Sequence, residues 1–150
     1  MIWRALAAFL ALPGVVAIAV PAWLAAGSLR TGGRWHAVGL LPLAAGLGLL
    51  LWCVRDFYVT GKGTLAPWAP PKHLVTTGLY RYSRNPMYVA VALMLTGWAL
   101  SFMSERLAIY AGFVVVAFQL RVVFGEEPWL ARIHGERWDQ YRSRVPRWLL

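Results

Sequence analysis

The sequence predicts an all-α integral membrane protein with about four transmembrane helices and a C-terminal amphipathic helix. Of its 150 residues, 59% are hydrophobic and only 14% are charged, and the mean hydropathy is +0.54. A soluble domain of this length has too small an interior to bury so much apolar surface. Since each spanning helix needs about 20 residues, the chain has room for roughly four or five spans in a single domain, residues 1–150.

Composition also excludes several other classes of protein. Disordered chains have low hydrophobicity, and a disulfide-stapled secreted module needs more cysteine than Cys53 alone. The formal net charge of +9 is compatible with a nucleic acid or an anionic lipid partner. A soluble nucleic-acid binder carries its charge on a polar body, which this chain lacks. We therefore expect membrane lipids, and no nucleic acid, among its partners.

The first two spans are predicted at about 5–26 and 36–54. The first follows Arg4 and contains Pro13 and Pro21, which membrane helices tolerate. A cleaved signal peptide is the alternative, although the apolar run is longer than a usual signal core. The second span carries small residues that let two helix backbones approach closely, namely Gly39, Ala44, Gly46 and Gly48. This packing can occur within one chain or between two, so the sequence leaves the oligomeric state open.

A long polar loop is predicted at 55–86, after the second span. Its glycines and prolines interrupt any continuous helix, and a loop of this length in a small domain is usually functional. Two further spans are predicted at 87–103 and 107–124. Because only three residues separate them, we expect a tight helical hairpin.

The C-terminal residues predict an interfacial amphipathic helix at about 128–143. Apolar and aromatic side chains recur three or four residues apart between charged residues, at Leu130, His134, Trp138, Tyr141 and Val145. Pro128 lacks a backbone N–H, so we expect the preceding helix to break there.

The distribution of Lys and Arg predicts the orientation in the membrane. In a four-span arrangement, twelve of these residues lie on the side that holds both termini and the 55–86 loop, and three lie on the other side. The positive-inside rule places the twelve in the cytoplasm. The loop and the tail then share the cytoplasmic face of a multi-pass protein in a bacterial or archaeal inner membrane.

Two polar clusters on this face are candidates for chemistry. The first is segment 73–88, with three Tyr, two Arg, one His and one Asn immediately before a span. The second is the adjacent pair Glu126 and Glu127. Neighbouring carboxylates at a membrane boundary require cationic partners, which Arg81 and Arg84 can supply. Taken singly, these residues are also typical of topology signals, interfacial aromatics and a helix start.

The sequence predicts no metal site and no phosphate-binding loop. The three histidines, His36, His73 and His134, are scattered, and Cys53 lies within a predicted span. None of these residues has the spacing of metal ligands. The chain contains no Walker-type or nucleophile-elbow motif.

Taken in order, the two clusters resemble a known superfamily. Segment 70–88 is followed by the two-helix hairpin, by the acidic pair, and then by Leu130, Gly135, Glu136, Tyr141 and the string Arg144, Val145, Pro146. This order is similar to that of the isoprenylcysteine carboxyl methyltransferase and phospholipid methyltransferase superfamily, over roughly the C-terminal two thirds of the chain. The resemblance implies a membrane methyltransferase without a Rossmann domain. It also implies S-adenosylmethionine as the cofactor and S-adenosylhomocysteine as its product.

The resemblance further implies where the cofactor is held. The residues concerned are His73, Leu74, Val75, Gly78, Tyr80, Arg84, Asn85, Pro86, Tyr88, Glu126 and Glu127. Carboxylates suit the cofactor's ammonium and ribose hydroxyls, Arg suits its carboxylate, and Tyr faces suit its sulfonium. Arg84 and Arg144 are predicted to be catalytic and close to the acceptor. The family commonly has Arg-His-Pro where this chain has Asn85, whose amide can still form hydrogen bonds.

We therefore expect methyl transfer to a lipophilic acceptor, either a small molecule or a lipidated group, in the manner of isoprenylcysteine carboxyl methyltransferases. Arginines near the acceptor favour a carboxylate, phenolate or thiolate. Phosphatidylethanolamine N-methylation is an alternative within the superfamily. A relative of the membrane sterol reductases and a non-enzymatic membrane scaffold are two further alternatives.

Overall fold

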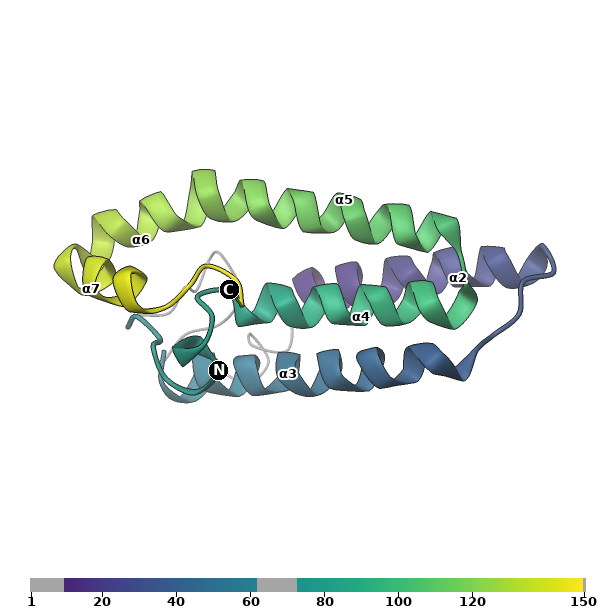
Figure 1. The fold of residues 1–150 in the computed structure, drawn as a ribbon, viewed down its shortest axis with the longest axis horizontal. Coiled ribbons are helices and arrows are strands. Elements are labelled where there is room, and N and C mark those ends of the chain that lie inside the picture. The colour runs from purple at the N-terminus through teal and green to yellow at the C-terminus, as the bar shows by residue number, and fades with distance from the viewer. Residues whose placement is uncertain (1–9, 62–72, 150) are drawn as a thin grey trace.

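A computed structural model describes residues 10–61 and 73–149, and in these residues it confirms the all-α fold (Figure 1). The helices are η1 (Leu10–Ala19), α2 (Val20–Arg30), α3 (Leu40–Val59), α4 (Pro86–Phe102), α5 (Glu105–Arg121), α6 (Glu127–His134) and α7 (Glu136–Arg144). Three short turns join or extend them, η2 (Ala37–Gly39), η3 (Gly78–Arg81) and η4 (Val122–Glu126). The described residues form no strand, so they provide no sheet for a Rossmann domain.

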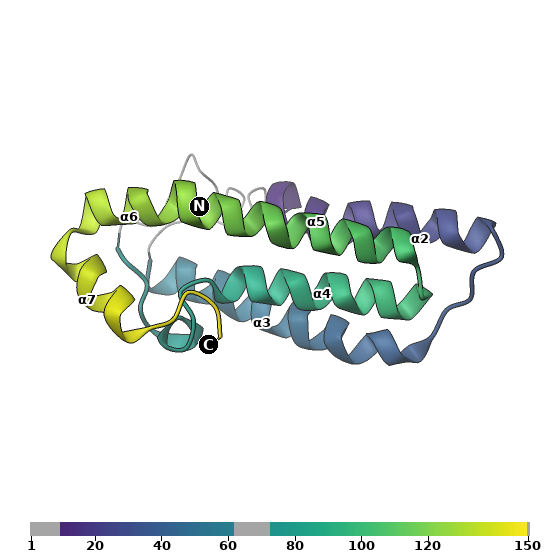
Figure 2. The same ribbon diagram turned by 45° about the horizontal axis from the view of Figure 1, so that its top comes forward.

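Three helical segments are long and apolar enough to cross a membrane, namely Pro13–Arg30, Ala37–Val59 and Glu105–His134. A fourth apolar helix, Pro86–Phe102, has 17 residues. The four run side by side in both views (Figures 1 and 2). Parts of the predictions, residues 5–9 of the first span and 62–72 of the loop, lie outside the described residues.

The outer faces of these helices are apolar and exposed. Trp23, Leu41, Phe113 and Phe124 each expose more than 70% of their surface. A soluble protein rarely leaves so many large apolar side chains in water, whereas a membrane covers them with lipid. The exposure pattern therefore agrees with the membrane fold predicted from composition.

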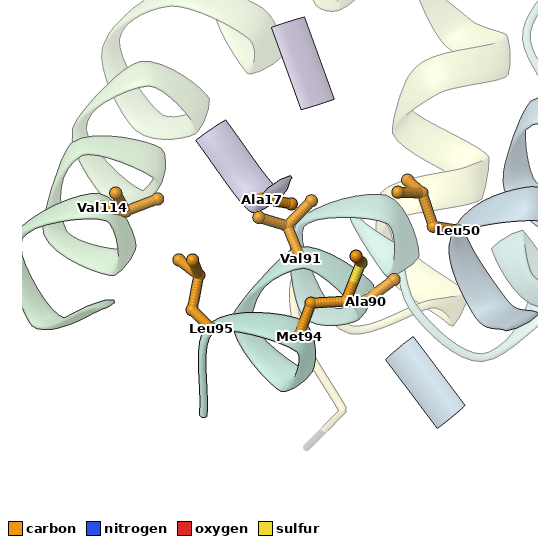
Figure 3. Packing of buried hydrophobic residues seen from close by; sticks show 7 residues of the cluster. All are labelled: Ala17, Leu50, Ala90, Val91, Met94, Leu95 and Val114. Carbon is orange, nitrogen blue, oxygen red and sulfur yellow. The ribbon is translucent and has the colours of Figure 1, made fainter. Parts of the chain in front are cut away.

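Helix α4 lies at the centre of the apolar core (Figure 3). It supplies four of the seven residues of the main buried cluster, which are Ala17, Leu50, Ala90, Val91, Met94, Leu95 and Val114. The other members come from η1, α3 and α5. Helix α4 packs against η1, α3 and α5, so its position is fixed. The polar segment that leads into its first residue, Pro86, is therefore anchored at that end.

The backbones of α3 and α4 pack closely at small residues. A Cβ atom added at Gly46 would lie 2.6 Å from the carbonyl oxygen of Ala90, and Gly39 lies directly against Gly97. Such contacts are typical of packed membrane helices. By contrast, Gly48 has no neighbour within 4 Å. The predicted small-residue stripe therefore packs within the chain at two of its glycines.

The break predicted at Pro128 is wrong, because the helical path continues through it from Glu105 to His134. The π-helical turn η4 precedes the proline, and the backbone N–H of Glu127 donates to the carbonyl of Val122. Pro128 then falls in the first turn of α6, where its missing N–H costs little. The wider π turn gives the ring room without a break. The acidic pair is thus carried on a continuous extension of α5.

The predicted single helix at 128–143 is also wrong in one respect, since it is two helices. Gly135, with φ of +49°, separates α6 from α7 and lets the chain turn back. The apolar spacing was nevertheless informative, because Trp138, Tyr141 and Val145 form a buried cluster with Leu74 packed against it. The apolar face of the tail therefore covers the polar segment before α4.

Candidate active site

The candidate site lies at the end of the bundle where α3 ends and α4 begins, beneath α6, α7 and the C-terminal residues (Figures 1 and 2). It is built on the turn η3, which starts at Gly78 with φ of +60°. A Cβ atom here would overlap Oδ2 of Asp56 and lie 3.0 Å from its Cγ. Only glycine combines this backbone conformation with this close approach. Gly78 thus brings the turn against the buried end of α3.

The junction between η3 and α4 is tied to the C-terminal segment. The backbone N–H of Arg84 donates to the carbonyl of Pro146 at 2.9 Å. The carbonyl of Arg147 accepts hydrogen bonds from the Asn85 amide at 3.0 Å and from the Ser83 hydroxyl at 3.3 Å. The Asn85 amide therefore forms a hydrogen bond, as expected where the family commonly has histidine. These hydrogen bonds hold the C-terminal segment against the residues that precede α4.

Helix α7 is joined to η3 by the Tyr141 hydroxyl, which donates to the carbonyl of Tyr80 at 2.7 Å. Both tyrosines are buried. Burial raises the pKa of Tyr141, and it raises the pKa of Tyr80 well above its ordinary value. The Tyr80 ring lies 5.4 Å from that of Phe57, at the end of α3.

Glu127 is surrounded by arginines. Its Oε1 lies 3.0 Å from Nη1 of Arg84, and it accepts hydrogen bonds from Nε and Nη2 of Arg147, both at 2.9 Å. Burial lowers the pKa of Arg84 while the Glu127 charge opposes this shift, and the hydrogen bonds to Glu127 raise the pKa of Arg147. Arg84 thus supplies the cationic partner expected for the acidic pair. Arg81 does not, because it is exposed and lies over the ring of Tyr82.

Glu126 has a separate set of partners at the membrane end of the site. It accepts hydrogen bonds from the Tyr88 hydroxyl and from Nε of Arg121, the latter at 2.8 Å. The Arg121 Nε also lies 3.1 Å from the Tyr88 hydroxyl. The Tyr88 ring stacks on Phe118, with 4.3 Å between the centroids. These contacts fix Tyr88 between α4 and α5.

A cavity of about 100 Å³ opens among these groups. Its lining residues are Phe57, His73, Leu74, Val75, Tyr80, Arg84, Asn85, Met87, Tyr88, Glu126, Leu130, His134, Trp138 and Tyr141. A second hollow, an apolar groove of about 450 Å³, lies along α4 and α5. It is lined by Tyr88, Val89, Ala92, Val115, Val116, Phe118, Gln119, Leu120 and Trp148. Tyr88 lines both, so the smaller cavity and the apolar groove adjoin at one side chain.

The phospholipid methyltransferase family matches the chain over residues 34–137. The chain belongs to this family. The matched region runs from just before η2 to the start of α7, and so includes both polar clusters and the hairpin between them.

Two curated relatives of this phospholipid methyltransferase family member are informative. A methanethiol S-methyltransferase of Crocosphaera subtropica is 34% identical over 80 residues, which cover 51% of this chain and 29% of the relative. The cobalt-zinc-cadmium resistance protein CzcN of Cupriavidus metallidurans is 32% identical over 125 residues, which cover 75% of this chain and 52% of the relative. The chain thus spans about half or less of the length of these relatives. No solved structure matches it.

For this family member, most of the residues predicted to bind the cofactor meet at the smaller cavity. Eight line it, namely His73, Leu74, Val75, Tyr80, Arg84, Asn85, Tyr88 and Glu126. The other three, Gly78, Pro86 and Glu127, lie outside the lining. Gly78 and Pro86 shape the backbone, and Glu127 pairs with arginines. The structure does not bring Arg144 to the cavity, because this residue is exposed at the end of α7.

Sequence reasoning assigned no role in the site to six residues of the cavity lining or to Arg147. The six are Phe57, Met87, Leu130, His134, Trp138 and Tyr141. Trp138 lines the cavity, and the guanidinium of Arg84 lies 5.5 Å from its ring centre. Its place in the amphipathic pattern of the tail was the available signal, which we interpreted as membrane anchoring. Arg147 is the arginine of the tail that reaches Glu127. Spacing alone could not distinguish it from Arg144, since the chain turns at Val145, which has extended dihedral angles.

Proposed function

We propose that this protein transfers a methyl group from S-adenosylmethionine to a lipophilic acceptor at the cytoplasmic face of the membrane, as isoprenylcysteine carboxyl methyltransferases do. The observation that carries the proposal is the junction, at Tyr88, of an aromatic-lined cavity that holds a few charged groups with an apolar groove. Membership of the phospholipid methyltransferase family and similarity to a methanethiol S-methyltransferase support methyl transfer as the reaction.

The donor set of the cavity fits the cofactor. Glu126 offers a carboxylate for an ammonium or hydroxyl group, and the rings of Tyr80 and Trp138 offer faces to a sulfonium or an adenine. Arg84 has a buried Nε with no hydrogen-bond partner, and such a donor requires an acceptor. The cavity therefore offers three kinds of group that suit S-adenosylmethionine. They are a carboxylate for its ammonium, a cationic donor for its carboxylate, and aromatic faces for its sulfonium or adenine.

The size of the cavity adds a requirement for movement. Its volume of about 100 Å³ is below the range of roughly 300–1,000 Å³ that small-molecule sites have. Binding of a nucleoside-sized ligand therefore requires its walls to separate.

The residues act chiefly by orientation and by exclusion of water. When bound, S-adenosylmethionine would supply a methyl group activated by its sulfonium and would leave as S-adenosylhomocysteine once the S–CH3 bond is broken. Alignment of the reacting atoms in a dry site accounts for most of the acceleration of such a displacement. Glu126 and Tyr88 hold each other at the junction of cavity and groove, so they position the two ligands relative to one another.

The groove supports a lipophilic acceptor. Its lining is almost wholly apolar, and its volume of about 450 Å³ lies within the range of roughly 300–1,000 Å³ for ligand sites. A hydrocarbon chain placed there would lie along α4 and α5 and present its polar end near Tyr88. A phospholipid amine is a second candidate acceptor, favoured by the family match.

Binding of S-adenosylhomocysteine to the detergent-purified protein, followed by calorimetry, tests the cofactor. We expect micromolar affinity that falls about tenfold or more in Glu126→Gln, because the charge that pairs with an ammonium is removed while the shape is kept. Glu136→Gln is the matched control, since Glu136 is exposed at the start of α7. Absence of binding to well-folded protein would contradict the proposal.

The acceptor is tested with S-adenosylmethionine labelled in its methyl group. The protein is incubated in its native membranes, and the label is divided between aqueous and chloroform extracts. We expect the label in the chloroform extract. Label only in water-soluble products would overturn the lipophilic acceptor while leaving methyl transfer in place.

A further inference from the structure

Arg147 is the residue of this site to which neither the family resemblance nor the motif analysis gives a role. It lies beyond α7, in the C-terminal segment that is hydrogen-bonded to Ser83 and Asn85, and it forms a bidentate pair with Glu127 through Nε and Nη2. Bidentate arginine–carboxylate pairs fix orientation as well as charge. The geometry of Glu127 is therefore determined mainly by Arg147.

Glu127 in turn has little capacity left for a ligand. With Arg84 at 3.0 Å and two hydrogen bonds from Arg147, three of its roughly four lone-pair sites are occupied. It is absent from the cavity lining, whereas Arg84 is present in it. Glu127 thus acts as an internal counter-ion between two arginines. The three side chains together carry one formal positive charge.

Arg84 is the member of this cluster that remains incompletely bonded. Its side chain is 12% exposed, Nη1 is engaged by Glu127, and Nε is buried without a partner. Its guanidinium lies over Trp138, which fixes the plane of the group. A buried cationic donor without an acceptor is costly, and a carboxylate is the acceptor that best matches a guanidinium.

We propose that Arg147 is a positioning residue that, through Glu127, holds Arg84 as the donor for a ligand carboxylate in the cavity. The inference rests on the proposed function, because the cofactor and an ionised acceptor are the two sources of such a carboxylate. It assigns Glu127 to the arginine cluster instead of to contact with the cofactor. The net positive charge of the cluster favours an anionic group beside Arg84.

The cofactor source is tested by comparing S-adenosylhomocysteine with its decarboxylated analogue in calorimetry. We expect the wild-type protein to prefer the carboxylate form by about tenfold or more, as a charge-assisted hydrogen bond provides. Arg84→Gln and Arg147→Gln should lose this preference yet still bind the decarboxylated analogue, which also reports correct folding. Arg147→Lys should restore part of the preference. Arg137→Gln, an exposed change on α7, should behave as wild type.

The acceptor source is tested by comparing palmitate with methyl palmitate as ligands of the same proteins. A preference for palmitate that depends on Arg84 and Arg147 supports the inference with the acceptor as the source. If the wild-type protein shows no preference in either pair, the carboxylate subsite is overturned, while binding of the nucleoside leaves the proposed function intact. A preference that persists in Arg147→Gln overturns the positioning role. If no nucleoside binds at all, it is the proposed function that fails.

Discussion

The Tyr141 hydroxyl is the group that holds α7 against the turn η3 at the candidate site. Its hydrogen bond to the Tyr80 carbonyl is buried and is 2.7 Å long. The bond links α7, late in the chain, to η3, which precedes the central helix. Trp138 and Val145 pack beside Tyr141 in one buried apolar cluster. Apolar packing alone does not fix how the two segments are aligned, whereas the hydrogen bond does.

Tyr141→Phe should therefore lower the free energy of unfolding by about 1–3 kcal/mol, because the buried Tyr80 carbonyl loses its side-chain donor. Thermal unfolding in detergent measures this effect, and calorimetry should show weaker binding of S-adenosylhomocysteine. Tyr58→Phe is the matched control, since Tyr58 is 45% exposed on α3. Equal melting temperatures for the two variants would contradict this prediction.

Individual residues also show how far sequence reasoning reaches into the site. The residue types that carry the chemistry were identifiable, because tyrosines, arginines and acids concentrate in two short segments. Their partners were only partly identifiable. The sequence places Glu126 and Glu127 side by side, yet successive positions on a helix project in different directions. Glu126 therefore faces Tyr88 and the cavity, while Glu127 faces the arginines.

Among the helices, the contact of α3 with α4 determines where the site is held. At Gly46 an added Cβ would meet the backbone of Ala90 at 2.6 Å and that of Met94 at 2.8 Å. Rigid backbone atoms cannot yield as a flexible side chain would. Two residues later, Gly48 meets nothing within 4 Å. The two glycines therefore provide a matched pair on one helix.

Gly46→Ala should destabilise the protein by about 1–3 kcal/mol, since the helices must separate to admit the methyl group. Gly48→Ala should be neutral, or stabilising by up to about 1 kcal/mol, because alanine favours helix. Melting temperatures in detergent distinguish the two outcomes. The prediction fails if both variants lose stability to the same extent.

Two helix ends could not be predicted correctly from the sequence, for related physical reasons. Pro128 was expected to end a helix, but the π turn η4 and its place in the first turn of α6 remove the penalty. The spacing of the tail predicted one helix, and Gly135 divides it. The spacing of apolar residues shows which face of a helix is buried, whereas the local backbone conformation decides where the helix axis changes direction.

The whole molecule was the easiest level to predict, because composition and hydropathy depend little on local geometry. The apolar helices, the hairpin, and the meeting of the two polar clusters all agree with expectation. The two ends of the bundle differ in charge. Helix α2 ends at Arg30 and α5 begins at Glu105, next to Arg106, at the end of the bundle opposite α6 and α7 (Figure 1). At the other end, Arg84, Arg121 and Arg147 form ion pairs with Glu126 and Glu127. The positive-inside rule therefore predicts that the site faces the cytoplasm.

Single cysteines placed at the two ends test this orientation in intact cells. Arg106→Cys should react with a membrane-impermeant maleimide from outside, whereas Arg137→Cys should react only after the cells are permeabilised. Both positions are exposed, and Cys53 is fully buried, so the unmodified protein is the unlabelled control. The reverse pattern would place the site outside the cell. S-adenosylmethionine made in the cytoplasm would not reach a site outside the cell. The proposed reaction therefore requires the labelling pattern of a cytoplasmic site.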